Sequence, residues 1–169
     1  ASYAITHRRP LYFCRTSDGA TTITHIDATM ADQPDMASHY GYWQRCCNAS
    51  LRWRAFSGHQ VHAATRGPEL VASVAGTHVS MYQRLLMYEA RLGRLPGDLV
   101  MPIRMDNKAS LANATADNIH RGSRHLAIRI GVIRQAVRDL IIKPYYINTS
   151  QNVADTMTKP LTRKQVLAF

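Results

Sequence analysis

The period of the apolar residues changes near Pro68, and this change limits the possible folds more than any other feature. In residues 21–28, TTITHIDA, apolar and polar residues alternate as they do in a strand with one buried face. From Pro68 onward, apolar residues recur every three or four positions, which is typical of a long helix with proline in its first turn. We therefore predict a block of strands before Pro68 and a block that contains helices after it.

Three strands are expected first, and the second and third form a hairpin because Asn48, Ala49 and Ser50 suit a turn. In chain order the expected elements are strands at 21–28, 40–47 and 51–56, a long helix from Pro68 that ends near 91–98, a strand at 100–105, a helix at 110–116, an amphipathic helix at 123–140, a strand at 141–148 and a terminal helix from Val153. This order predicts an α/β fold with a mixed five-stranded sheet, three antiparallel strands and then parallel ones, flanked by helices.

Length and composition predict one globular domain. The chain has 169 residues, of which 46% are hydrophobic and 19% are charged. No apolar run approaches the roughly 18 residues that span a bilayer, so we expect no membrane partner. Residues 1–20 begin without Met and without an apolar signal region; we assign them to a linker or remnant of an upstream connection segment, and residues 21–169 to the folded domain. Cys14, Cys46 and Cys47 fit a reducing compartment.

The positive charge indicates an anionic partner. Lys and Arg number 21 against 11 acidic residues, the net charge is +10, and 17 of the 21 cations are Arg. One guanidinium group can donate two hydrogen bonds to the oxygens of a phosphate, so we favour nucleic acid as the partner over anionic lipid or an acidic protein. The alternative is that a GC-rich genome has enriched arginine without functional consequence.

Four acidic residues fall at the ends of predicted elements. Asp27 ends the first strand, Glu69 opens the long helix, Asp106 ends the fourth strand and Asp155 opens the last helix. Such positions can meet at one edge of a sheet, where carboxylates repel one another unless a cation lies among them. Oxygen ligands of this kind suit Mg²⁺, and two such ions can promote phosphodiester cleavage. Alternatively, these acids only complement helix dipoles and strand ends.

Short motifs occur in a defined order along the chain. They are DATMA at 27–31, YGY at 40–42, Trp53 followed by Ser57 and Gln60, PEL with Ala72 at 68–72, MDNK at 105–108, RHL with IR at 124–129, and YINTSQNVADTMTKPL at 146–161. They resemble DADWA, SGY, W…SxxQ, AELxA, CDNQ, KHIDIR and YVxTxxQxADxxTKPL in the ribonuclease H domain of copia-type LTR retrotransposon polyproteins. The resemblance runs from about Leu11 onward, and extends more loosely to ribonuclease H in general.

The resemblance implies a ribonuclease H-like fold and a metal-dependent endonuclease that cleaves the RNA strand of RNA/DNA hybrids during reverse transcription. Its catalytic residues and ligands for two Mg²⁺ or Mn²⁺ ions would be Asp27, Glu69, Asp106 and Asp155. Residues that contact the nucleic-acid backbone would be Gln60, Asn107, Arg121, Arg124, Arg129, Arg134 and Arg138, the last three on the cationic surface of the amphipathic helix. The partner would be an upstream reverse transcriptase domain or a host ribonucleoprotein. The location would be intracellular, either cytoplasmic in a virus-like particle or nuclear.

The sequence also departs from the family pattern. Arg66 and Gly67 precede Pro68 where the family has Thr-Glu, Ala127 replaces an Asp, and Gly131 replaces a His. An alternative is therefore a domesticated, non-catalytic module that binds RNA or protein in a larger ribonucleoprotein assembly. A third possibility is an integrase-type or resolvase-type relative, although such a site needs three acids and Asp155 would be unexplained.

Overall fold

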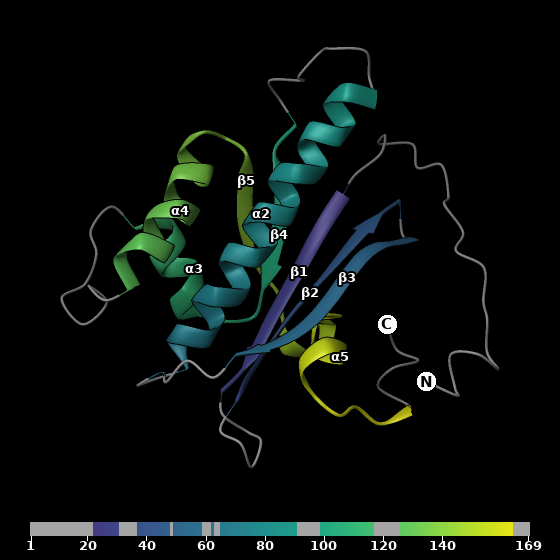
Figure 1. The fold of residues 1–169 in the computed structure, drawn as a ribbon, viewed down its shortest axis with the longest axis vertical. Helices are drawn as coiled ribbons and strands as arrows, with labels where there is room; N and C mark the ends of the chain where they lie inside the picture. The colour runs from purple at the N-terminus through teal and green to yellow at the C-terminus, as the bar shows by residue number, and fades with distance from the viewer. Residues whose placement is uncertain are drawn as a thin grey trace.

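The structure is a computed structural model that describes residues 22–30, 37–47, 49–58, 62, 65–90, 99–116 and 126–163. Its elements in chain order are β1 (Thr22–Thr29), β2 (Ser38–Cys46), β3 (Ala49–Gly58), α2 (Arg66–Ala90), β4 (Met101–Met105), α3 (Lys108–Thr115), α4 (Ala127–Arg138), β5 (Ile142–Tyr146), the 3-10 helix η2 (Thr149–Gln151) and α5 (Asp155–Thr158) (Figure 1). This order matches the predicted one. The proposed boundary at residue 20 lies outside the described residues and stays a prediction.

The strands form one mixed sheet in the order β3-β2-β1-β4-β5. The pairs β1–β2 and β2–β3 are antiparallel, whereas β1–β4 and β4–β5 are parallel. This confirms the predicted α/β architecture. Pro144 lies in β5, which is an edge strand, where a missing backbone donor is tolerated.

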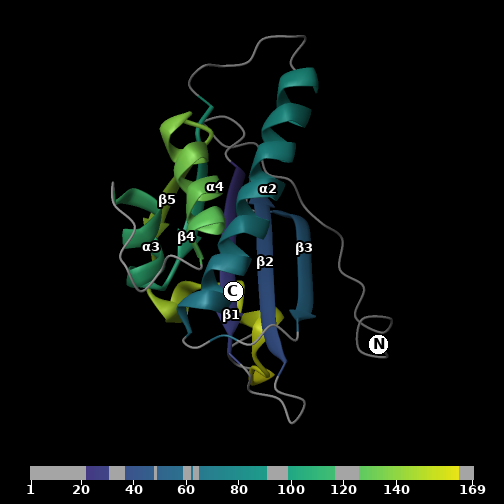
Figure 2. The same ribbon diagram turned by 60° about the vertical axis from the view of Figure 1, so that its left-hand side comes forward.

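Helices cover both faces of the sheet. A Cβ added to Gly76 of α2 would lie 2.5 Å from Ile26 Cγ2, so α2 packs directly on the face of β1 that carries Ile26. Asp27, the next residue of β1, points to the opposite face and contacts α5 through Thr158. Figures 1 and 2 show α2, α3 and α4 together on one side and α5 near one end of the sheet.

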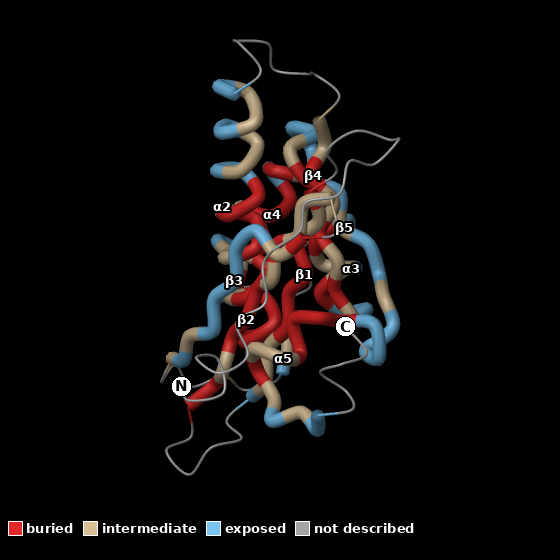
Figure 3. The backbone as a smooth tube through the Cα atoms, turned by 90° about the vertical axis from the view of Figure 1, so that its right-hand side faces the viewer, coloured by how far each residue is buried: buried red, intermediate tan, exposed pale blue. Residues whose placement is uncertain are grey.

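The core lies between the sheet and the α2, α3 and α4 layer. Its fully buried members include Ile26, Leu70, Ile103, Ile130 and Ile142, which come from both the strands and the helices (Figure 3). Burial of this kind of apolar surface contributes about 25 cal/mol per Å². One cluster therefore joins the antiparallel and parallel halves of the sheet.

The end of α2 is exposed. Leu85 and Leu86, which belong to the apolar positions that predicted one long helix, are 50% and 39% exposed. A helix of 25 residues is about 37 Å long, whereas β1 with 8 residues spans about 26 Å. The last turns of α2 therefore extend beyond the sheet, as the pale end of this helix shows in Figure 3.

The other differences concern lengths. The terminal helix is a single turn, α5, and a 3-10 turn precedes it.

Within the described residues, none of the helices combines the length and apolar character needed to cross a membrane.

Candidate metal centre

The parallel pairing of β1 with β4 brings two carboxylates together. The register pairs Thr24 with Ile103 and His25 with Arg104. Asp27 lies two residues beyond His25 in β1, and Asp106 lies two residues beyond Arg104, just after β4, so both reach the same edge of the sheet. This is the convergence at strand ends that the sequence predicted.

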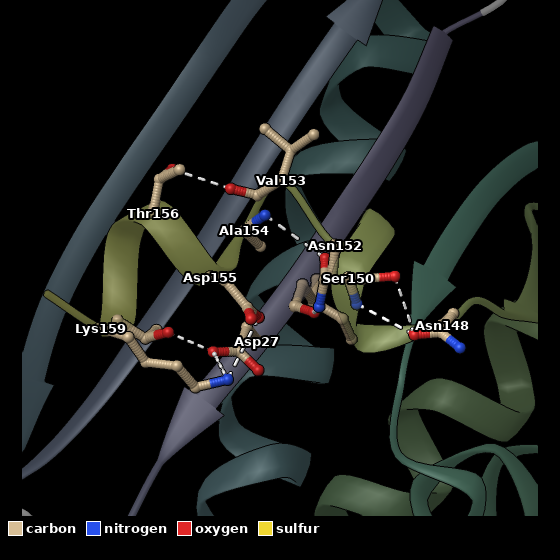
Figure 4. Close-up of polar contacts among 11 residues, drawn as sticks. Asp27, Asn148, Ser150, Asn152, Val153, Ala154, Asp155, Thr156 and Lys159 are labelled. Atoms are coloured by element: carbon tan, nitrogen blue, oxygen red, sulfur yellow. Dashed lines mark hydrogen bonds and ion pairs between the residues drawn. The ribbon is translucent and has the colours of Figure 1, made fainter. Parts of the chain in front are cut away.

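A buried asparagine brings the third carboxylate to this edge. Asn152 is fully buried, and its Nδ2 donates a hydrogen bond of 2.9 Å to the Ile26 carbonyl of β1. Its Oδ1 accepts from the Ala154 amide at 3.3 Å, just before α5 begins (Figure 4). Asn152 therefore holds the start of α5 against β1, with Asp155 beside Asp27.

Asp27, Asp106 and Asp155 form a compact group of oxygen donors. Each offers one carboxylate oxygen, and these oxygens all lie within 4.8 Å of one another. Asp27 is 1% exposed and Asp155 is 7% exposed, so water only weakly screens the repulsion between their negative charges. Three hard oxygen ligands at this spacing suit a divalent cation such as Mg²⁺ or Mn²⁺.

Glu69 adds a fourth carboxylate from the first turn of α2. It is buried, and its Oε2 has no hydrogen-bond partner among the described residues. Burial first, and then the charges of Asp27 and Asp106, raise the pKa of Glu69 to about 8, although a hydrogen bond with Asn107 opposes the change. The structure therefore places all four predicted acids at one site. The Glu69 Oε2 atom, which is buried without a hydrogen-bond partner among the described residues, is available to coordinate a metal ion.

The pKa values of Asp155 and Asp27 are raised as well. Burial and the neighbouring Asp27 raise the pKa of Asp155 to about 6. Burial also raises the pKa of Asp27, against hydrogen bonding from Thr158 and the charge of Lys159. Asp27, Glu69 and Asp155 thus hold protons more tightly than usual, and a cation among them would reverse this tendency.

Known structures with the same architecture were found. The N-terminal ribonuclease H domain of Rv2228c from Mycobacterium tuberculosis superposes with a TM-score of 0.60 at 12% identity, over 89% of this chain and 96% of that one. Ribonuclease H1 from Halobacterium salinarum gives 0.58 at 12% identity, over 88% and 98%. The fold is that of ribonuclease H.

A further ribonuclease H structure was determined with nucleic acid. LC11 ribonuclease H1, isolated from compost, was solved in complex with an RNA/DNA hybrid and gives a TM-score of 0.58 at 13% identity, over 82% of this chain and 94% of that one. No protein-family model matches the sequence, and no curated protein matches it. The likeness to ribonuclease H is therefore one of fold.

Two residues of the site were missed by the sequence analysis. The Lys159 Nζ lies 3.2 Å from Asp155 Oδ1 and 3.4 Å from Asp27 Oδ2 (Figure 4). The Thr158 hydroxyl donates to the same Asp27 oxygen. Burial alone would lower the pKa of Lys159, but Asp27 and Asp155 together raise it. The four-residue spacing from Asp155 to Lys159 was the available signal, because oppositely charged residues at this spacing meet on a helix.

The predicted nucleic-acid contacts divide into three groups. Asn107 caps α3 by accepting from the Ser110 amide at 3.0 Å and also bonds Glu69, so it supports the site from within the protein. Arg138 is exposed on α4, and Arg129 is half-buried. Gln60, Arg121 and Arg124 lie outside the described residues.

Arg134 requires a correction. We expected it on the outer, cationic surface of the amphipathic helix, but it is only 9% exposed. Its Nε donates a hydrogen bond of 2.8 Å to the Asn113 carbonyl of α3. Arg134 therefore links α4 to α3, and the prediction that it lies on the exposed surface was wrong. Helical periodicity could not show this, because α3 covers a second side of α4.

A first prediction concerns pH. Glu69 has a pKa of about 8 in the folded protein and an ordinary pKa of 4.5 in the unfolded chain, so between these values the folded state binds a proton that the unfolded state has lost. The stability of the metal-free protein should therefore fall as pH rises, by about 2 kcal/mol between about pH 6.5 and 8.5. Folded His25, whose pKa is lowered to about 4, is neutral throughout this window; in the unfolded chain it loses its proton near pH 6.5, which opposes the Glu69 effect by less than about 0.5 kcal/mol. Urea unfolding in EDTA measures the change.

Glu69→Gln is the matched variant for this measurement, because it keeps the shape of the side chain and removes the titration. Its stability should vary much less across the same pH window. Equal pH slopes for the wild type and Glu69→Gln would show that Glu69 does not carry the effect.

A second prediction concerns the asparagine that positions α5. Asn152→Ala would remove two buried hydrogen bonds and leave the Ile26 carbonyl without its Asn152 donor. We expect a loss of about 1–3 kcal/mol in the free energy of unfolding. Asn148→Ala is the control, because Asn148 is exposed and its side chain accepts hydrogen bonds from Ser150 alone in the described contacts. Similar losses in both variants would contradict the positioning role of Asn152.

Proposed function

We propose that this chain is a metal-dependent endoribonuclease that cleaves the RNA strand of RNA/DNA hybrids. The observation that carries the proposal is the convergence of Asp27, Asp106, Asp155 and the buried Glu69 at one edge of a ribonuclease H fold. The hybrid bound to LC11 ribonuclease H1, a protein of the same fold, supports the choice of substrate.

The four carboxylates would hold two divalent cations, Mg²⁺ or Mn²⁺. Bound there, such ions supply an activated water and neutralise the charge that develops on the leaving oxygen. The residues of the chain keep the ligands in place: Thr158 donates to Asp27, and Asn107 bonds Glu69. Hydrolysis adds one water across a P–O bond of the RNA strand, which leaves a 5′-phosphate and a 3′-hydroxyl.

Recognition of the hybrid would use backbone contacts. The net charge of +10 favours any polyanion, and A-form duplexes are recognised through phosphates and 2′-hydroxyls in the minor groove. We assign backbone contacts to Arg129 and Arg138 of α4, and to Gln60, Arg121 and Arg124. Arg134 is withdrawn from this set because it is buried against α3.

The biological context that we propose is reverse transcription of a retroelement. The resemblance of residues 146–161 to the copia-type motif supports this choice. The partner would be an upstream reverse transcriptase domain or a host ribonucleoprotein. The site of action would be a cytoplasmic virus-like particle or the nucleus.

A second candidate function is a non-catalytic module that binds RNA or protein. The observation that favours it is Lys159, whose ammonium group already neutralises Asp27 and Asp155. Permanent occupation of these two oxygens by Lys159 would turn the metal centre into an internal salt bridge.

The two functions can be distinguished by measuring the rate at which the chain cleaves four labelled substrates with Mg²⁺ or Mn²⁺. The substrates are RNA/DNA hybrid, double-stranded RNA, single-stranded RNA and double-stranded DNA. An endoribonuclease of the proposed class cuts the hybrid RNA strand at least about 100-fold faster than the other substrates, a difference of about 2.7 kcal/mol in activation free energy. Tight binding of RNA or hybrid without any cleavage would instead support the non-catalytic module.

A further inference from the structure

The carboxylate cluster already contains a positive charge that comes from the protein itself. The Lys159 Nζ lies between Asp27 and Asp155, at 3.4 Å and 3.2 Å from one oxygen of each (Figure 4). The same two residues belong to the group whose oxygens lie within 4.8 Å of one another. The ammonium group and a divalent cation would therefore use the same two carboxylates.

The two cations would compete for these carboxylates. Mg²⁺ takes its oxygen ligands at about 2.0–2.1 Å, so an ion on Asp27 and Asp155 would lie within a few ångströms of the Lys159 ammonium group. At such distances, in a partly buried site, the repulsion between the two cations is strong. One of them has to leave.

Lys159 is able to leave. Its side chain is 33% exposed, whereas the Asp27 and Asp155 side chains are 2% and 10% exposed. Lysine carries its charge on a flexible four-carbon stem, so the ammonium group can move into water while the backbone of α5 stays in place. The Asn152 and Thr158 hydrogen bonds hold that backbone and Asp27 independently of Lys159.

We propose that Lys159 is an exchangeable counter-ion, which holds Asp27 and Asp155 together in the metal-free protein and is displaced when a divalent cation binds there. This inference rests on the proposed function only in requiring that the site binds a divalent cation. Lys159 then has two opposite effects: it stabilises the metal-free fold, and it weakens metal binding because every binding event must break its two ion pairs.

The test measures metal binding and stability in Lys159→Gln, with Lys143→Gln as a control that also loses one positive charge. Lys143 is exposed on β5 and contacts the Tyr145 ring, away from the carboxylates. We expect Lys159→Gln to bind Mn²⁺ about tenfold more tightly in calorimetric titration at constant ionic strength. Its melting temperature in EDTA should fall by several degrees. Lys143→Gln should change neither quantity appreciably.

A measurement on the unmodified chain keeps the proposal testable if Lys159→Gln fails to fold. Acetic anhydride labels free lysine amines, and mass spectrometry reads the extent of labelling at each site. Labelling of Lys159 should become faster when Mg²⁺ is added to protein in EDTA-treated buffer, because the displaced amine enters water. Labelling of Lys143 should not change.

The outcomes separate this inference from the proposed function. Tighter Mn²⁺ binding by Lys159→Gln supports the inference even if the wild-type chain never cleaves a hybrid, and in that case only the endonuclease proposal fails. Unchanged or weaker Mn²⁺ binding by Lys159→Gln, or a Lys159 labelling rate that Mg²⁺ leaves unchanged, overturns the inference. Absence of Mn²⁺ binding in both the wild type and Lys159→Gln also overturns it.

Discussion

Asp106→Asn is expected to slow cleavage of the RNA/DNA hybrid by about 10²–10⁴-fold, because it removes one ligand charge from the proposed centre while keeping the shape of the side chain. Asp106 follows β4 and contributes one of the three oxygens within 4.8 Å of one another. Hybrid affinity without metal should stay the same or increase, since a negative charge near the phosphates is lost. Single-turnover rates with saturating protein measure the effect.

Asp139→Asn is the control for this prediction. Asp139 lies at the exposed end of α4, where it accepts a hydrogen bond from Gln135, and it takes no part in the carboxylate cluster. The same chemical change there should leave the cleavage rate within about twofold, as expected for a surface substitution. A wild-type rate for Asp106→Asn would remove Asp106 from the proposed active site.

Gly41→Ala is expected to damage the site without touching a carboxylate. A Cβ at Gly41 would lie 2.5 Å from Met157 Cβ and 3.1 Å from Thr158 Cγ2, so α5 must move away from β2. Thr158 bonds Asp27, and a displacement of about 1 Å in such a site can reduce the rate about 100-fold. Crowding of this kind also lowers the free energy of unfolding by about 1–3 kcal/mol.

Gly131→Ala provides the matched comparison, since it adds the same methyl group to α4. No atom lies within 4 Å of a Cβ at Gly131, and alanine favours the helix over glycine by about 0.5–1 kcal/mol. This variant should cleave normally and melt slightly higher than the wild type. If Gly41→Ala behaves like Gly131→Ala, close packing of α5 on β2 does not position Asp27.

The main outline of the fold could be predicted because periodicity reports which side of each element is buried. The alternation in β1 and the helical spacing after Pro68 predicted a mixed five-stranded sheet with the correct order of elements. Periodicity does not report where a partner surface ends, so it could not show that α2 is longer than the strands it covers and leaves Leu85 50% exposed. For the same reason it could not detect that α3 buries Arg134.

The candidate site could be predicted as a set of acids but not as an electrostatic environment. Strand ends and helix starts indicated that Asp27, Glu69, Asp106 and Asp155 would converge. The depth of burial that raises the pKa of Glu69 to about 8 depends on the packing of α2 against the sheet, which spacing in the sequence does not contain. Lys159 was missed because its contact with Asp27 joins residues that are far apart in the chain.

The most direct test of the account uses the purified chain and a hybrid whose RNA strand is end-labelled, with Mg²⁺, with Mn²⁺ and with EDTA. The account predicts internal cuts in the RNA with either metal, none in EDTA, an intact DNA strand, and products that carry a 5′-phosphate and a 3′-hydroxyl. RNA that stays whole with both metals at a stoichiometric excess of protein, or cleavage that persists unchanged in EDTA, would contradict it.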